Sequence, residues 1–171
     1  TALPVEYDAT AECPTFESYL KEVCPRSVDR KKLQEYAGYT LMHWGLPYHK
    51  ALFLVGPTAS GKSTFLDVVR ALLGVENTTS IGLQTLANEK DAVADFYGSI
   101  ANIDDDLSER KLGSGLGMFK KLTSGAEVRG RNLYESGFKF KATGKHLYAA
   151  NQVPQVDVDD EDEAFWRRWL L

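Results

Sequence analysis

The sequence predicts an α/β fold with a mostly parallel β-sheet flanked by helices, and three features lead to this class. Ala51–Val55 is a continuous apolar run of strand length, which is typical of a parallel strand buried on both faces. A glycine-rich turn follows it, and residues 62–73 then repeat apolar side chains with helical spacing. Residues 96–103 and 146–150 are further candidate strands. A strand, a loop and a helix in this order open a layered α/β domain.

Two helices are predicted before the first strand. Residues 16–23 and 33–41 repeat apolar side chains at intervals of three and four, and Pro25 would end the first helix. We therefore divide the chain into an N-terminal helical segment, residues 1–48, and an α/β core, residues 49–171. Because the chain begins without methionine and stops in an apolar run, we expect it to be a segment of a longer polypeptide or to have an incomplete last strand.

The second half of the core has shorter elements. Residues 75–95 predict a loop with a short helix, and residues 116–122 predict a helix that Gly125 would end. Residues 126–141 alternate in polarity around several turn residues, which predicts a β-hairpin. Six acids stand among residues 157–163, as in a solvent-exposed loop.

Composition excludes several classes of protein. The chain has 171 residues, of which 43% are apolar and 26% charged, so it is neither disordered nor fibrous. No apolar stretch approaches the length of a membrane helix. The two cysteines match no zinc pattern and predict reduced thiols of a cytoplasmic protein. The net charge of -4 argues against coating nucleic acid with the whole surface, but it leaves room for a local basic patch.

A phosphate-binding loop follows the first strand. The pattern G-x-x-x-x-G-K-[ST] is matched by Gly56, Pro57, Thr58, Ala59, Ser60, Gly61, Lys62, Ser63 and Thr64. Two glycines permit backbone angles that aim successive N–H groups at an anion, and the following helix adds its positive dipole end. The lysine can reach the β- and γ-phosphates and the serine hydroxyl can bind Mg²⁺. The loop therefore predicts nucleotide binding, with ATP and Mg²⁺ as ligands.

The loop alone does not name the reaction. Small-molecule kinases share it, and residues 56–62 also spell the opening of tRNA prenyltransferases. Those prenyltransferases carry the loop near their N-terminus, with an Asp-Ser pair and a tyrosine-bearing motif soon after it. Here about 50 residues precede the loop, and residues 75–98 contain no such motif.

Three consecutive acids end the second candidate strand. Asp104, Asp105 and Asp106 would stand at its carboxyl end, where open α/β sheets bind ligands. In phosphate-loop ATPases one carboxylate there serves the magnesium shell and its neighbour polarises the attacking water. An acidic turn without function remains the alternative.

A basic stretch follows in a chain that is acidic overall. Residues 120–145 hold seven basic residues and two glutamates. Basic side chains around glycines suit a loop that follows the phosphates of a nucleic-acid strand. The candidate DNA-binding residues are Lys120, Lys121, Arg129, Arg131 and Asn132. A solvated basic face is the alternative.

Six more segments carry recognisable motifs: residues 14–20, 33–39, 101–108, 119–125, 149–154 and 165–168. With the phosphate loop, in this order and spacing, they resemble superfamily 3 helicases, specifically the primase-helicases of phages, plasmids and poxviruses. The first two are similar to that family's helical collar. The others are similar to its Walker B strand, its B′ motif, its motif C and its arginine-finger segment.

The resemblance assigns roles to single residues. A small residue often fills the Asp104 position in the family, so Asp105 and Asp106 are implied as the working pair, with Asp105 and Ser63 at the metal. Asn151 is implied as the sensor of the γ-phosphate, and Arg167 or Arg168 as the finger that acts on a neighbouring subunit. Ala126 stands where the B′ motif often has an acid.

The resemblance also implies a function. It predicts a modified AAA+ ATPase, a replicative DNA helicase motor that forms ring hexamers around single-stranded or forked DNA, with a primase domain on the same polypeptide. No membrane partner is expected, and the compartment would be the cytoplasm, of a host cell if the protein is viral. The alternatives are an ATP-binding ring-assembly module that does not unwind DNA, and a phosphate-loop transferase or kinase.

Overall fold

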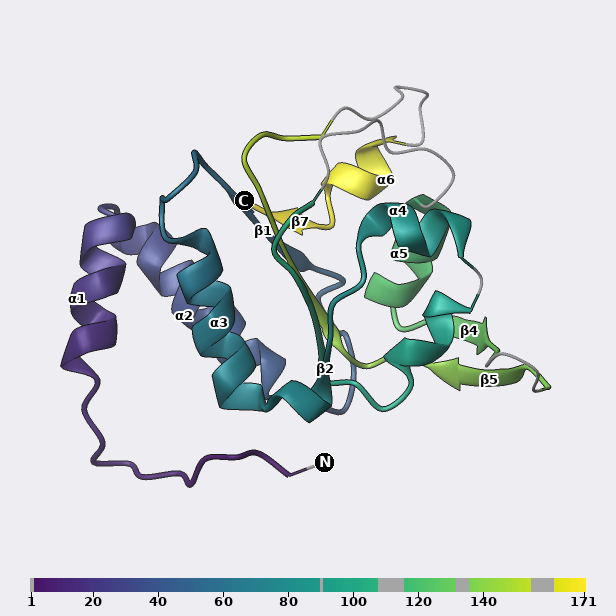
Figure 1. The fold of residues 1–171 in the computed structure, drawn as a ribbon, viewed down its shortest axis with the longest axis horizontal. Helices are drawn as coiled ribbons and strands as arrows, with labels where there is room; N and C mark the ends of the chain where they lie inside the picture. The colour runs from purple at the N-terminus through teal and green to yellow at the C-terminus, as the bar shows by residue number, and fades with distance from the viewer. Residues whose placement is uncertain (1, 90, 108–115, 132–135, 155–161) are drawn as a thin grey trace.

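Five parallel strands form the central sheet of the computed structural model, which describes residues 2–89, 91–107, 116–131, 136–154 and 162–171 (Figure 1). All neighbouring strands are parallel, and their spatial order is β2 (Thr78–Thr79), β3 (Ala101–Asp104), β6 (Lys145–Ala150), β1 (Ala51–Val55) and β7 (Trp169–Leu170). The predicted class, an α/β fold with a mostly parallel sheet flanked by helices, is confirmed.

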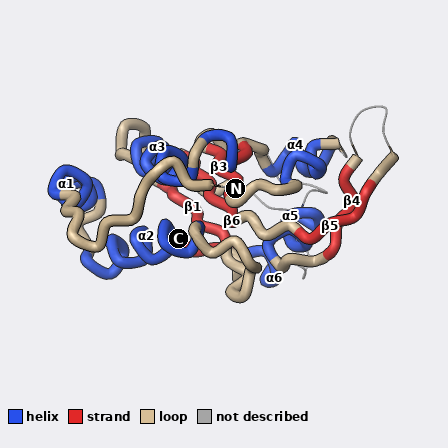
Figure 2. Tube along the Cα trace, turned by 90° about the horizontal axis from the view of Figure 1, so that it is seen from below, coloured by secondary structure: helices blue, strands red, loops and turns tan. Residues whose placement is uncertain are grey.

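Helices cover both faces of this sheet (Figures 1 and 2). One layer holds α1 (Pro14–Val23), α2 (Ser27–Thr40) and α3 (Lys62–Leu73). The other holds α4 (Leu83–Asn88), α5 (Leu116–Thr123), α6 (Asp162–Trp166) and a hairpin of β4 (Glu127–Gly130) and β5 (Phe138–Lys141). The hairpin lies at the end of the molecule opposite α1. Within the described ranges, no helix has the length and apolar character needed to cross a membrane.

Each layer packs its own apolar core against the sheet, because successive side chains of a strand point to opposite faces. In β1, Leu52 belongs to the core that contains Phe65 of α3, whereas Phe53 belongs to the core that contains Phe119 of α5. Both cores have fully buried members. The helix that follows the phosphate loop is therefore held against one face of the sheet only.

Most predicted elements are confirmed within one or two residues. The helix after the loop is α3, and Gly74 ends it with a positive φ of 86°. The two helices before the first strand, the helix of residues 116–122 and the hairpin are also present. The acidic residues 157–161 lie outside the described part of the chain.

Two predicted boundaries are wrong. The second strand begins at Ala101 and not at residue 96, because Ala92–Phe96 forms a short 3-10 helix, η2, whose Val93 and Phe96 are buried under the hairpin layer. Helix α2 begins at Ser27, before the predicted start. Its first turns are charged and bind each other, Asp29 contacting Arg26 and Lys32. The residues of these ion pairs are charged, so they do not repeat apolar side chains at helical spacing. The apolar pattern therefore could not reveal the first turns of α2.

Candidate nucleotide-binding site

The phosphate loop turns between the end of β1 and the start of α3. Gly61 has a φ of 88°, and its carbonyl accepts the N–H of Phe65 at 3.1 Å, so α3 begins at Lys62 as predicted. The second positive φ in the loop belongs to Ala59, at 61°, and not to Gly56. A Cβ on Gly56 would lie 3.1 Å from the Ser60 hydroxyl, a close contact that the serine side chain would have to relieve. The expectation that both glycines supply unusual backbone angles is therefore wrong for Gly56.

The ammonium of Lys62 lies over this loop. Its Nζ donates to the carbonyls of Gly56 at 2.7 Å and Pro57 at 2.8 Å, and it lies 3.4 Å from both Ser60 Oγ and Asn151 Oδ1. Within the described residues, these acceptors are all uncharged. An anion that enters the loop can therefore replace neutral oxygens around a full positive charge without breaking an ion pair. Ser63 and Thr64, which follow on α3, are exposed.

Sheet order brings Asn151 to Lys62. Strand β6 lies between β1 and β3, so three adjacent parallel strands end at one edge, which carries the loop, Asn151 and the acids Asp104 to Asp106. Sequence separation hides this proximity, because 89 residues separate Lys62 from Asn151. The structure thus places one predicted site residue from β6 in contact with the loop.

Asp104 differs from the two acids that follow it. Its Oδ2 is buried and has no hydrogen-bond partner among the described residues, whereas Asp105 and Asp106 are exposed. Asn102, two residues earlier on the same face of β3, donates to the Tyr148 hydroxyl at 3.1 Å. Asp104 therefore faces the layer of α4 and α5, away from α3. Burial, followed by the charges of Asp105 and Asp106, raises the pKa of Asp104 to about 6.

This raised pKa predicts a pH-dependent stability. The folded chain binds the Asp104 proton more tightly than the unfolded chain, so the stabilisation is complete below pH 4 and is lost as the pH rises through 6. We expect Asp104→Asn to stabilise the fold at pH 8 by about 1–2 kcal/mol, after allowance for solvent screening, and by less at pH 5. Denaturant unfolding at both pH values in EDTA measures this, with Glu22→Gln, an exposed change on α1, as control. Equal stabilisation at pH 5 and pH 8 would contradict it.

The two candidate arginines lie far from the loop of their own chain. Trp169 pairs with Ala51, so Arg167 and Arg168 stand beside the start of β1, and the loop begins at its other end. The five residues of β1, at about 3.3 Å each, separate them. Arg168 folds back, donating to the Ala164 carbonyl, whereas the side chain of Arg167 is exposed.

Three of the five predicted DNA-binding residues, Lys121, Arg129 and Arg131, line one groove beside the hairpin. A groove of about 620 Å³ between α5 and the hairpin is lined by Met118, Lys121, Glu127, Val128, Arg129, Arg131 and Lys139. Lys139 pairs with Glu127 at 2.8 Å. Lys120 lies half-buried on α5, and Asn132 lies outside the described residues.

Close packing requires one glycine of this hairpin. Gly130 is among the turn residues that predict the hairpin, but it lies within β4 and is buried, paired with Phe138. A Cβ there would lie 2.9 Å from the Cα of Ala94, so only glycine lets β4 approach η2 this closely. A Cβ on Gly137 would lie 2.6 Å from Nε of Arg129, but this atom belongs to an exposed, flexible side chain that can move away.

Sequence reasoning missed a cavity of about 510 Å³ beside the phosphate loop, lined by residues of α1, α2, β1 and the loop. Tyr19 of α1 donates its hydroxyl to the Gly61 carbonyl at 2.6 Å. The helical pattern of α1 marked Tyr19 as a core residue, and nothing in that pattern indicates a contact 42 residues away.

Two of the solved structures that resemble this chain are apo structures of the C-terminal region of NrS-1. The structure of residues 305–718 has a TM-score of 0.71 over 94% of this chain and 38% of that chain, at 14% identity. The A form has a TM-score of 0.68 over 94% and 37%, at 14% identity. This chain thus spans less than two fifths of those structures, and the low identity shows a shared fold alone. Comparison with the curated proteins gave no match.

One family model matches two thirds of the chain, over residues 54–168. The matched segment includes the phosphate loop, all three acids of β3, Asn151 and both candidate arginines. The chain belongs to this family, which is described as a family of unknown function (DUF5906).

Proposed function

We propose that this chain is the ATP-driven motor segment of a superfamily 3 DNA helicase within a larger viral or plasmid primase-helicase. The observation that carries the proposal is the meeting of the phosphate loop, Lys62 and Asn151 at one sheet edge, beside the acidic end of β3. The motif order of the sequence supports the same function.

ATP is the substrate that this edge suits. The β- and γ-phosphates lie in the nest of loop N–H groups, and Lys62 exchanges the Gly56 and Pro57 carbonyls for phosphate oxygens. Asn151, already beside Lys62, is placed to donate its amide to the γ-phosphate or to hold the attacking water. Lys62 then stabilises the charge that develops as the γ-phosphoryl group leaves.

Exposed oxygen donors fit a magnesium ion at this edge. Magnesium prefers oxygen ligands and keeps several waters, and Ser63 and Asp105 offer an exposed hydroxyl and an exposed carboxylate. The ion, held by these residues, would neutralise phosphate charge. Asp106 would accept the proton of the attacking water.

The position of the arginines supports assembly into a ring. A guanidinium at the start of β1 cannot serve the loop at its end, so the structure favours action on a neighbouring subunit. Since Arg168 is bonded to the Ala164 carbonyl of the preceding helix α6, Arg167 is the finger in this proposal. The partner is a second copy of this chain, and the ring is a hexamer.

Mixing two inactive variants tests this arrangement. Arg167→Ala and Lys62→Ala damage different halves of a shared site, so a mixture of the two should recover part of the ATPase activity that each lacks. Subunit exchange is verified first by co-purification. In a control mixture, Asp105→Asn replaces the finger variant; it damages the same half of the site as Lys62→Ala, so this mixture should recover no activity. No recovery in co-assembled mixtures would contradict action between subunits.

The basic groove of the hairpin is the proposed DNA path. Phosphate contacts depend on salt and hardly on sequence. We expect the double change Arg129→Ala and Arg131→Ala to weaken binding of single-stranded DNA and to lower the log–log salt slope by about 0.7 for each lost contact. Basal ATP hydrolysis should survive, because the loop and the acids are untouched.

A salt titration with a labelled oligonucleotide, beside a DNA-free ATPase assay, measures this. Lys21→Ala with Lys31→Ala removes two exposed charges from α1 and α2, at the other end of the molecule, and serves as control. An unchanged salt slope would mean that the hairpin does not contact the DNA. Loss of basal ATP hydrolysis would mean that the hairpin belongs to the ATP site.

Strand displacement decides the function as a whole. ATP hydrolysis that DNA stimulates, with unwinding of a forked duplex, is the expected result. ATP hydrolysis without strand displacement would favour the ring-assembly module. ATP hydrolysis at a rate that DNA does not change would favour a transferase or kinase.

A further inference from the structure

The cavity beside the phosphate loop lies on the side of the loop where α1, α2 and β7 are found. Its walls come from Tyr19 and Val23 of α1, Asp29 and Leu33 of α2, Phe65 of α3 and Leu170 of β7. Its floor is β1, and Gly61 and Lys62 belong to its lining. Tyr19 is hydrogen-bonded to the Gly61 carbonyl, so this wall is fixed to the loop itself.

Sheet order gives the direction of a bound nucleotide. In the order β6-β1-β7, the loop follows the middle strand. Lys62 contacts Asn151 at the end of β6, and the proposed role of Asn151 as sensor puts the γ-phosphate on that side. The nucleoside at the other end of the molecule must extend toward β7, and the cavity with Leu170 in its wall lies there.

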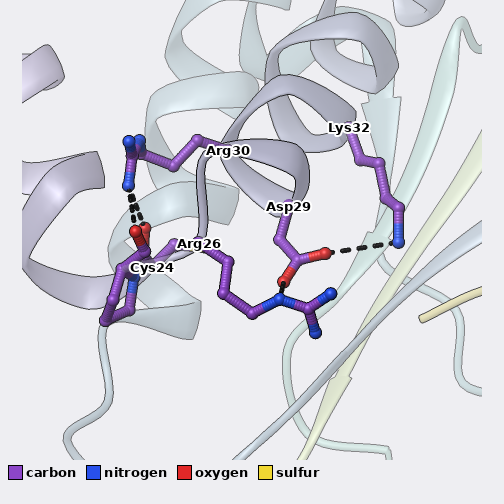
Figure 3. Close-up of polar contacts among 6 residues, drawn as sticks. Cys24, Arg26, Asp29, Arg30 and Lys32 are labelled. Atoms are coloured by element: carbon purple, nitrogen blue, oxygen red, sulfur yellow. Dashed lines mark hydrogen bonds and ion pairs between the residues drawn. The ribbon is translucent and has the colours of Figure 1, made fainter.

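The cavity has the size and character of a nucleoside site. Its volume of about 510 Å³ falls within the 300–1,000 Å³ that is usual for small-molecule pockets, and its walls are mostly apolar. Flat rings bind between such walls, and a few polar groups orient them. Here the charged groups stand together at the elbow between α1 and α2 (Figure 3).

That elbow is built around Asp29. Its two carboxylate oxygens lie 3.3 Å from Arg26 Nε and 3.3 Å from Lys32 Nζ, longer than a strong charged hydrogen bond, so each oxygen keeps the capacity to accept another (Figure 3). Arg30 donates to the Cys24 carbonyl at 2.8 Å and to the Pro25 carbonyl at 2.6 Å, which holds the elbow closed.

We propose that this cavity binds the nucleoside half of ATP, with the base between the apolar walls and the ribose hydroxyls donating to Asp29. The inference rests on the proposed function, since it needs phosphates in the loop. It adds that the elbow distinguishes ribose from sugars without hydroxyls, and that the walls recognise a flat ring more than its exocyclic groups.

Alkylation of Cys24 tests the location. Cys24 lines the cavity and is partly exposed, and the other cysteine, Cys13, is removed by Cys13→Ser. At about ten times its Kd, MgATP should slow the reaction of Cys24 with iodoacetamide about tenfold. Tripolyphosphate with Mg²⁺ at matched saturation, which occupies the loop without a nucleoside, should leave the rate nearly unchanged.

The outcomes separate the two proposals. If tripolyphosphate protects Cys24 as well as ATP does, or if bound ATP gives no protection, the nucleoside lies elsewhere and the cavity assignment is overturned. If neither ligand binds to the wild-type protein, and Lys62→Ala does not change the Cys24 alkylation rate, the phosphate site is disproved. The cavity assignment depends on that site and is then disproved as well.

A second measurement tests the contact with ribose. The chain should bind ATP about tenfold more tightly than 2′,3′-dideoxy-ATP, and Asp29→Ala should bring the two Kd values together. Glu17→Ala is the matched control, because Glu17 is also an acid in the first turn of its helix and does not line the cavity. Equal wild-type affinities, or discrimination that survives Asp29→Ala, would overturn the role of Asp29.

Discussion

Replacement of Lys62 by alanine is expected to abolish ATP hydrolysis and to leave the fold intact. Its ammonium is held by loop oxygens and contributes to neither apolar core, so little folding energy depends on it. In the transition state it would be a main source of positive charge at the γ-phosphate. Loss of one preorganised donor typically costs about 100-fold to 1,000-fold in kcat, and loss of a full charge should cost at least as much.

The measurement is steady-state ATP turnover with thermal unfolding on the same samples. Lys31→Ala is the matched control, since Lys31 lies exposed on α2 and pairs with Glu35. A Lys62→Ala protein that melts normally and keeps near-normal turnover would be incompatible with the phosphate-loop function.

The acids at the end of β3 should give the second largest effect. We expect Asp105→Asn and Asp106→Asn each to lower kcat by about 100-fold or more while changing ATP affinity by less than about threefold. An amide keeps the shape of the carboxylate but neither carries its charge nor takes a proton from water. Asp104→Asn should lower kcat far less, because the Oδ2 atom of Asp104 is buried, whereas Asp105 and Asp106 are exposed at the edge of the sheet.

Single-turnover kinetics with the three variants in parallel separate binding from chemistry. The result opposite to our expectation is a kcat that falls most for Asp104→Asn, which would shift the catalytic pair by one residue. The stability of Asp104→Asn at pH 8 is the internal reference, since that variant should be more stable than wild type even where its turnover is normal.

Sequence periodicity was a good guide wherever one face of an element is apolar. It predicted α3, β1 and β6, whose side chains enter the two cores. It failed where charges pair with one another, as in the first turns of α2, and where apolar residues are buried in a 3-10 turn, as in Ala92–Phe96. Charge pairs and a 3-10 turn are local features, and neither repeats with the strand period of two residues or the α-helix period of 3.6 residues.

For the site, the sequence by itself determined the chemistry that is available. A glycine loop with a lysine, a strand that ends in acids and an asparagine after a buried strand are local patterns, and each is recognisable from its own neighbours. Tertiary structure alone decided which of these groups meet. It placed Asn151 beside Lys62 and put Arg167 at the far end of β1.

It also turned Asp104 away from α3 and formed a cavity between α1, α2 and the loop. The physical reason is that strand order and helix docking are set by the burial of side chains far apart in the chain. No local pattern encodes which strand lies next to which.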